Sequence, residues 1–183
     1  GLLIGNPFNE SYSRFRADAI LYYNNGLILI DFKDYKGIIK LPPNENEFHS
    51  TKWHNESPKD RSRLEIKAGA NFINPFRQLV SYRNAFRELI DKNKYFDGIN
   101  PARVCIANIF SGPIEIHNEV PRNLPYYKLI QESDLGNFLY DFASENTYKE
   151  ENVKVFKSIF PAEEWIKNIE IPIPEQIIEK QIT

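Results

Sequence analysis

The 183-residue chain contains no methionine, only one cysteine, and no apolar run near the roughly 20 residues that a membrane-spanning helix needs. The single Cys105 cannot form an intrachain disulfide, which excludes a disulfide-stapled scaffold and fits a reducing compartment such as the cytoplasm. The first residues lack the pattern of a signal peptide. Without methionine the chain lacks its own initiator, so we expect it to be part of a longer protein. Its hydrophobic content of 42% suffices for the core of one soluble domain.

The formal net charge of −2 conceals an uneven distribution. Residues 1–131 carry 18 Lys and Arg against 14 Asp and Glu, whereas residues 132–183 carry 5 against 11. Residues 52–94 contain 10 basic and 5 acidic side chains, with aromatic residues between them. This pattern fits a surface that follows nucleic-acid phosphates, and it fits a solvated face of mixed charge equally well.

The strongest local signal is a predicted hairpin over residues 17–33, Ala-Asp-Ala-Ile-Leu-Tyr-Tyr-Asn-Asn-Gly-Leu-Ile-Leu-Ile-Asp-Phe-Lys. Asn-Gly is the pair that a two-residue type I′ turn favours, so Asn25-Gly26 is expected to form the turn. That register sets Asp18 opposite Lys33, and Asp31 diagonal to Asp18. Because residues two apart on a strand share a face, Asp18, Asp31 and Lys33 are expected on one side of the sheet.

Two carboxylates and an ammonium on otherwise hydrophobic strands must be paired, metal-bound or catalytic, because isolated buried charges are costly. Asp18 and Asp31 would lie close enough to hold one divalent cation, and oxygen-only ligands favour Mg²⁺ or Mn²⁺. Lys33 beside them would hold a hydroxide or stabilise the charge that develops on a phosphodiester. A three-residue loop would turn Asp18 to the opposite face and remove this site.

An Asp on one strand followed by Asp31-Phe32-Lys33 on the next resembles the PD-(D/E)XK nuclease superfamily. The wider context resembles its nuclease-related domain, NERD, over roughly residues 10 to 92. Asp31 stands where that family usually has Glu, and the superfamily accepts either residue. The segments that carry the resemblance are residues 17–23, residues 27–37 with their closing glycine, Trp53, residues 65–69 (Glu-Ile-Lys-Ala-Gly) and residues 74–79 (Asn-Pro-Phe-Arg-Gln-Leu).

The resemblance implies metal-dependent hydrolysis of DNA phosphodiesters, with RNA a less favoured substrate. Asp18 and Asp31 would bind Mg²⁺ or Mn²⁺, and the Phe32 backbone carbonyl and, more weakly, Glu10 would be further ligands. The alternative for Glu10 is an exposed acidic residue in a loop, which is the more common case for such residues.

Two further roles follow from the same resemblance. Lys33 would position the attacking water or help to deprotonate it. Gln78 would orient that water or a phosphate oxygen, although most glutamines on a helix flank are structural. Nucleic-acid contacts are expected from Lys36, Arg77, Tyr82, Arg83 and Arg87, for which ordinary solvated side chains are the alternative.

Proteins with this domain are often fused to helicase or other catalytic regions, so the expected partners are DNA and another domain of the same chain. A homo-oligomer is compatible with the resemblance, and no membrane contact is expected. Two other hypotheses stay open. One is a catalytically silent nucleic-acid-binding or docking module with a nuclease fold, and the other is a structural domain in which Asp18 and Lys33 form a cross-strand salt bridge.

The predicted fold is α/β and restriction-endonuclease-like, with a mixed central sheet, an antiparallel hairpin and meander, and flanking helices. Residues 1–168 are expected to form the domain, and residues 169–183 a linker. The meander would continue through strands at 38–41 and 63–67, around an exposed loop at 42–60 that contains Trp53. Asn74 and Pro75 predict a helix from 75 to about 92. Beyond it we expect strands at 103–110 and 126–130, a loop at 113–125, and helices at 133–143, 151–159 and 162–168.

Overall fold

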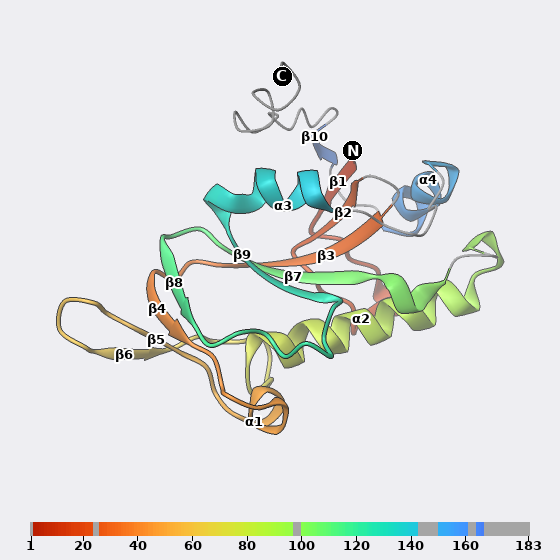
Figure 1. Cartoon of the computed structure of the whole chain (residues 1–183). Helices are drawn as coiled ribbons and strands as arrows, with labels where there is room; N and C mark the ends of the chain where they lie inside the picture. Colours follow the sequence, from red (N-terminus) through yellow and green to blue (C-terminus); the bar gives the residue numbers. More distant parts are fainter. Residues whose placement is uncertain (1, 24–25, 97–99, 143–149, 161–163, 167–183) are drawn as a thin grey trace, which may run out of the picture.

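The main sheet is mixed, with six strands in the order β10-β1-β2-β3-β7-β9. The computed structural model describes residues 2–23, 26–96, 100–142, 150–160 and 164–166. Strands β1, β2 and β3 are antiparallel, whereas β3, β7 and β9 run parallel. The predicted α/β class is therefore confirmed (Figure 1). The strand bounds are β1 (Leu2–Gly5), β2 (Ala19–Tyr23), β3 (Gly26–Lys33), β7 (Cys105–Phe110), β9 (Tyr127–Gln131) and β10 (Glu164–Ile166).

Helices cover both faces of this sheet, which explains why β7 is buried along its whole length. Helix α2 (Pro75–Lys92) packs on one face, and α3 (Leu135–Asp141) packs on the other (Figure 1). The Asn74 side chain accepts a hydrogen bond from the Arg77 N–H, and Pro75 occupies the first turn. The predicted start of α2 is confirmed. Asn74 pairs a backbone N–H of the first turn that would otherwise lack a partner, and the φ angle of Pro75 is already that of a helix.

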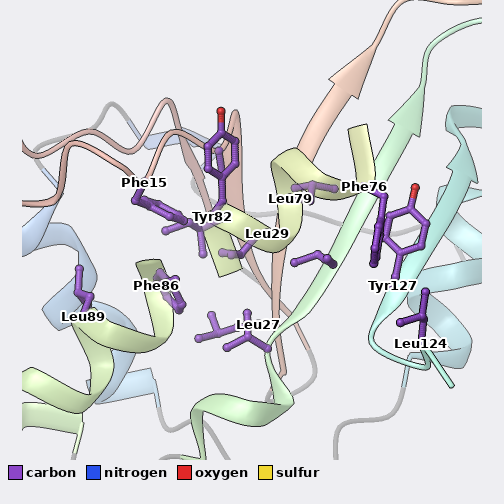
Figure 2. Packing of buried hydrophobic residues seen from close by; sticks show 14 of the residues in the cluster. Phe15, Leu27, Leu29, Phe76, Leu79, Tyr82, Phe86, Leu89, Leu124 and Tyr127 are labelled. Carbon is purple, nitrogen blue, oxygen red and sulfur yellow. The ribbon is translucent and has the colours of Figure 1, made fainter. Parts of the chain in front are cut away.

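Aromatic rings fill the core between α2 and the sheet. The rings of Phe76 and Tyr127 lie side by side with centroids 4.9 Å apart (Figure 2). Helix α4 (Glu150–Ile159) adds Phe156, whose ring lies 5.2 Å from that of Phe86. The α2 face thus joins residues from the hairpin, α2 and the C-terminal part of the chain in one cluster.

The meander lies in a second sheet, which has four strands in the order β6-β5-β4-β8. Strands β4, β5 and β6 are antiparallel and β8 runs parallel to β4. The meander was expected in the central sheet with β4 and β6 as its only further strands, and that is wrong: it lies in a separate sheet, and β5 separates β4 from β6. The bounds are β4 (Gly37–Lys40), β5 (His54–Glu56), β6 (Arg63–Glu65) and β8 (Ile114–His117). Strand β8 lies within the expected loop at 113–125, where its exposed residues hid it from the sequence pattern.

The prediction of an exposed loop at 42–60 is wrong. Those residues contain α1 (Glu45–Ser50) and β5, and Trp53 is 0% exposed. The Trp53 ring lies 4.8 Å from that of Phe48, which is the one buried residue of α1. Two apolar side chains therefore anchor a segment whose other residues are mostly polar.

Several smaller elements complete the described chain. Residues Glu164–Ile166 form a strand that pairs with β1. The helix expected at 162–168 is therefore wrong for these residues. A segment this short gains more from backbone hydrogen bonds to the edge of a sheet than from a single helical turn. The expected linker at 169–183 lies outside the described residues. No helix of the described part of the chain is long and apolar enough to cross a membrane. The short 3₁₀ turns are η1 (Glu10–Tyr12), η2 (Lys94–Phe96), η3 (Pro101–Arg103) and η4 (Glu132–Asp134).

Trp53→Ala should lower the free energy of unfolding by about 3 to 5 kcal/mol, because it leaves a cavity in the core. Urea unfolding followed by circular dichroism measures the change. Tyr140→Ala is the matched control, since Tyr140 is 46% exposed and its truncation should cost much less. Equal losses in the two variants would contradict the buried position of Trp53.

Candidate active site

The hairpin register differs from the predicted one by two residues. Tyr23 pairs with Gly26 and Ala19 with Ile30, so Gly26 belongs to β3 and not to the turn. The paired part of β2 ends at Ala19, and the Asp18 N–H donates at 2.9 Å to the carbonyl of Ile30, the partner of Ala19, so Asp18 lies out of register at the end of the ladder. The predicted pairing of Asp18 with Lys33, and with it the diagonal arrangement of the two aspartates, is therefore wrong. The shift is even, however, so the residues paired between β2 and β3 keep their predicted faces.

The acidic residues lie on the face that α2 covers. Ile20 and Leu29, each two residues from an aspartate, belong to the core cluster under α2. Asp31 and Lys33 continue this face of β3 and are 3% and 8% exposed, while Asp18 is half-buried beside them. The structure thus brings Asp18, Asp31 and Lys33 together on one side of the sheet, at the end of β3.

Asp31 receives three polar side chains from three different elements. The Lys33 ammonium lies 2.8 Å from Asp31 Oδ2, and the Asn108 amide donates to the same oxygen at 2.7 Å. The Gln78 amide donates to Oδ1 at 2.9 Å. These residues belong to β3, β7 and α2, so the carboxylate connects the sheet to the helix above it.

Gln78 is fixed by partners at both ends of its amide. Its Oε1 accepts from the Gly69 N–H at 2.7 Å and from the Lys33 ammonium at 3.4 Å. Its Nε2 also donates to the Tyr82 hydroxyl at 3.2 Å. A Cβ at Gly69 would lie only 3.0 Å from Gln78 Nε2, so glycine lets the loop before α2 approach this closely. The amide orientation follows, because Oε1 faces two donors and Nε2 faces two acceptors.

Burial and charge oppose each other at Asp31. Burial, the largest cause, raises the pKa of Asp31 from 3.8 to about 6, while the Lys33 ammonium and the Gln78 amide lower it and the Asp18 charge raises it further. The pKa of Tyr82 is also raised, mainly by burial. Asp31 therefore changes its charge close to neutral pH.

Sequence reasoning missed Asn108 and Tyr127. The buried Tyr127 hydroxyl donates to Asn108 Oδ1 at 2.8 Å, which orients the amide so that Nδ2 faces Asp31. Burial, with a smaller effect of Asp31, raises the pKa of Tyr127 well above its usual range, so the hydroxyl keeps its proton. A lone Asn in the apolar run Val-Cys-Ile-Ala-Asn-Ile-Phe was the available signal.

The residues at this site fit Mg²⁺ or Mn²⁺ through two carboxylates. Asp18, the residue before β2, and Asp31 on β3 supply oxygen donors near one another, and Mg²⁺ is commonly held by one or two carboxylates with water completing its shell. Within the described ranges, no group of three or more His, Cys, Asp or Glu side chains is placed to hold a metal. Glu10 is exposed in η1 and, as far as the structure describes the chain, has no hydrogen bond to either aspartate.

The backbone of Phe32 contacts the acidic site. The Phe32 N–H donates to Asp18 Oδ2 at 2.8 Å, which holds that carboxylate against β3. The Phe32 side chain is 45% exposed. The role of the Phe32 backbone carbonyl as a metal ligand stays a prediction.

The cationic residues expected to contact nucleic acid divide into two groups. Lys36 and Arg77 are exposed, as a phosphate contact requires. Arg83 is 8% exposed, donates to the Val104 carbonyl at 2.8 Å and to the Ala102 carbonyl, and stacks on Tyr126, so its position favours a structural role over the predicted contact. Arg87 is half-buried, and its Nε has no hydrogen-bond partner among the described residues.

Comparison with known proteins gives one family. The model of the nuclease-related domain (NERD) matches residues 3–108, which is more than half of the chain. The matched segment contains the hairpin, α2 and Asn108, and so includes every side chain that contacts Asp31. Searches of curated proteins and of solved structures gave no match.

Asp31→Asn should change how the free energy of unfolding depends on pH. The folded pKa of about 6 lies above the unfolded value near 3.8, so the contribution of wild-type Asp31 to stability is full below about pH 4 and is lost as the pH rises through 6. The loss is up to about 3 kcal/mol for a shift of this size. The variant does not titrate at this position, so the stability difference, variant minus wild type, should grow between pH 4 and pH 7.

Urea titrations across this pH range measure that difference. Asp91→Asn, at an exposed position of α2, is the matched control and should leave the pH dependence unchanged. A pH-independent difference for Asp31→Asn would show that Asp31 does not titrate abnormally in the folded protein.

Proposed function

The chain belongs to the nuclease-related domain (NERD) family, and from this premise we propose that it is a metal-dependent nuclease that hydrolyses DNA phosphodiester bonds. The observation that carries the proposal is a buried carboxylate, Asp31, held 2.8 Å from the Lys33 ammonium and near enough to Asp18 for the charge of Asp18 to raise the pKa of Asp31. Two carboxylates could hold a divalent cation for phosphodiester hydrolysis, and the lysine could act beside it.

A bound Mg²⁺ or Mn²⁺ would supply an activated water and offset negative charge on the phosphoryl group. Asp18 and Asp31 would hold the ion, with the Phe32 carbonyl as a further ligand. Above pH 6 most Asp31 carboxylates are ionised, so the site is ready to hold a cation at neutral pH.

Lys33 is the group that would act on the substrate. Its ammonium lies between Asp31 Oδ2 and Gln78 Oε1, which restrict its position from two sides. From there it would hold the attacking water or stabilise charge on the phosphate oxygens. The fixed position lowers the reorganisation that the reaction requires.

Gln78 would act as a positioning residue. Both acceptors of its Nε2, Asp31 and Tyr82, belong to the protein, and its Oε1 already accepts from two donors. Direct contact with the attacking water would require the loss of one of these bonds. Gln78 would therefore orient Asp31 and Lys33, and through them the water.

The family resemblance supports DNA over RNA as the substrate of this module. It also supports a nuclease that would work within a larger protein, beside a helicase or another domain. Exposed Lys36 and Arg77 would contact phosphates.

A silent binding or docking module is the second candidate. The observation that favours it is that no group of three potential ligands is placed for a metal in the part of the chain that the structure describes. In that case the Lys33–Asp31 pair would be structural, and DNA would bind without being cut.

Cleavage of supercoiled and single-stranded DNA under a Mg²⁺ or Mn²⁺ titration tests the proposal. Wild type should cut only with the divalent ion, and activity should rise as the pH increases through about 6, because Asp31 ionises there. Asp31→Ala and Lys33→Met should each lower the rate by about 10²- to 10³-fold, because each removes a preorganised charge.

Asp91→Asn serves as the control for altered charge and should cut like wild type. DNA binding without cleavage at any divalent concentration would instead support the silent module. Cleavage that persists in Lys33→Met at the wild-type rate would exclude the role given to Lys33.

A further inference from the structure

A second polar site begins one residue beyond Lys33, at the four-stranded sheet. A cavity of about 820 Å³ lies there, between the segment that follows β3 and strands β4, β5, β6 and β8. Its apolar lining includes Tyr35, Ile38, Leu64 and Ile114. Pockets for small ligands commonly occupy about 300 to 1,000 Å³, so this one can hold a nucleotide.

Two lysines supply the cationic groups of the cavity lining. Four charged side chains line it, namely Asp34, Lys36, Lys59 and Glu115. Asp34 accepts from the Ser111 hydroxyl at 2.9 Å, and Glu115 lies 2.6 Å from the His117 ring. Among the described residues, neither lysine ammonium has an ion-pair or hydrogen-bond partner. The lysines are thus the charged groups of this lining that remain to bind an anion.

A buried amide supplies the second polar feature. Asn55 lines the cavity and is 9% exposed. Its Nδ2 donates to the Lys36 carbonyl at 2.7 Å, whereas its Oδ1 has no hydrogen-bond partner within the described residues. Buried polar atoms are rarely left unpaired, so this oxygen is open to a donor from outside the chain.

The backbone holds this cavity open. Gly37 has a φ of +105°, and a Cβ there would lie 2.7 Å from the Glu56 carbonyl oxygen. Only glycine allows the chain to turn here and run so close to β5. The position of the Lys36 carbonyl, and with it the orientation of Asn55, depends on that turn.

The cavity is also connected to the acidic site. The hydroxyl of Tyr35, which lines the cavity, accepts from the Lys67 N–H at 2.9 Å. Two residues further along, the Gly69 N–H holds Gln78 at 2.7 Å. Because the lining of the cavity begins at Asp34, the residue after Lys33, a nucleic-acid strand bound at the acidic site would have the cavity beside it.

We propose that this cavity binds one unpaired nucleotide of the DNA substrate. The apolar walls would receive the face of the base, an amino group on the base would donate to Asn55 Oδ1, and Lys36 and Lys59 would contact the flanking phosphates. The inference rests on the proposed function and makes it narrower: the preferred substrate is single-stranded or frayed DNA whose bases carry amino groups.

Binding of short fluorescent oligonucleotides to the full chain in EDTA tests the proposal, because cleavage is then prevented. Three single strands are compared, which carry adenine, purine without the amino group, or abasic sites. Wild type should bind the adenine strand about tenfold more tightly than the abasic strand, since a stacked base is lost in the latter. The purine strand should fall between them, because the bond to Asn55 is missing.

Variants assign these differences to the cavity. Asn55→Leu should bind adenine and purine strands equally, while still discriminating against abasic DNA. Lys36→Gln with Lys59→Gln should weaken binding of all three strands and reduce the salt dependence. Lys92→Gln, an exposed lysine at the end of α2, is the matched control and should bind like wild type.

Equal binding of the three strands by wild type would overturn the proposal, as would adenine preference that survives in a folded Asn55→Leu. If that variant fails to fold, NMR of the wild-type protein decides instead. The side-chain amide signals of Asn55 should shift when the adenine strand is added and not when the abasic strand is added. Any other result would overturn the proposal. DNA cleavage without base discrimination would overturn only the proposal that the cavity binds a base. Base-dependent binding without cleavage would overturn only the proposal that the protein is a nuclease.

Discussion

The ionisation of one buried carboxylate constrains the whole site. Asp31 is 3% exposed, and burial alone favours its neutral form, so the charged form exists near neutral pH only because donors from β3, α2 and β7 surround it. Each donor is fixed in turn, Gln78 by the Gly69 N–H and Asn108 by the Tyr127 hydroxyl. The sheet, the crossover helix and the loop before it must therefore all be in place for this carboxylate to carry a charge while it is buried.

The pleat of the sheet explains why the predicted acidic face survived a wrong register. The alternation of side chains has a period of two, so the observed shift of two residues changed the partners across the hairpin but not the faces of the paired residues. Ile20 and Leu29 therefore still share the face of Asp31. A shift of one residue would have turned Ile20 to the α3 face, which Ile28 and Ile30 of β3 line.

Short sequence patterns correctly predicted the features that depend on neighbouring residues. The cap formed by Asn74 and Pro75 gave the start of α2, and strand periodicity gave the shared face of the charged residues. Asn108 and Tyr127 reach Asp31 through parallel pairing of β3, β7 and β9, which depends on crossovers that no short segment encodes. Trp53 looked exposed because its neighbours in the sequence are polar, and only the tertiary fold shows that the rings of Phe48 and Tyr127 pack against it.

The cost of this polar network bears on the choice between a nuclease and a silent module. A buried ion pair adds little net stability, and well-packed apolar residues of similar size often serve a fold as well or better. A domain that only had to hold its shape would gain nothing from Asp31 and Lys33 in the core of its sheet. Their position at the end of β3 also leaves Asp18 half-buried beside them, and the next residue of the chain lines a cavity whose two lysines have no ion-pair partner among the described residues. The charged residues thus gather at one end of the sheet, and this placement favours the proposed chemistry over a purely structural role.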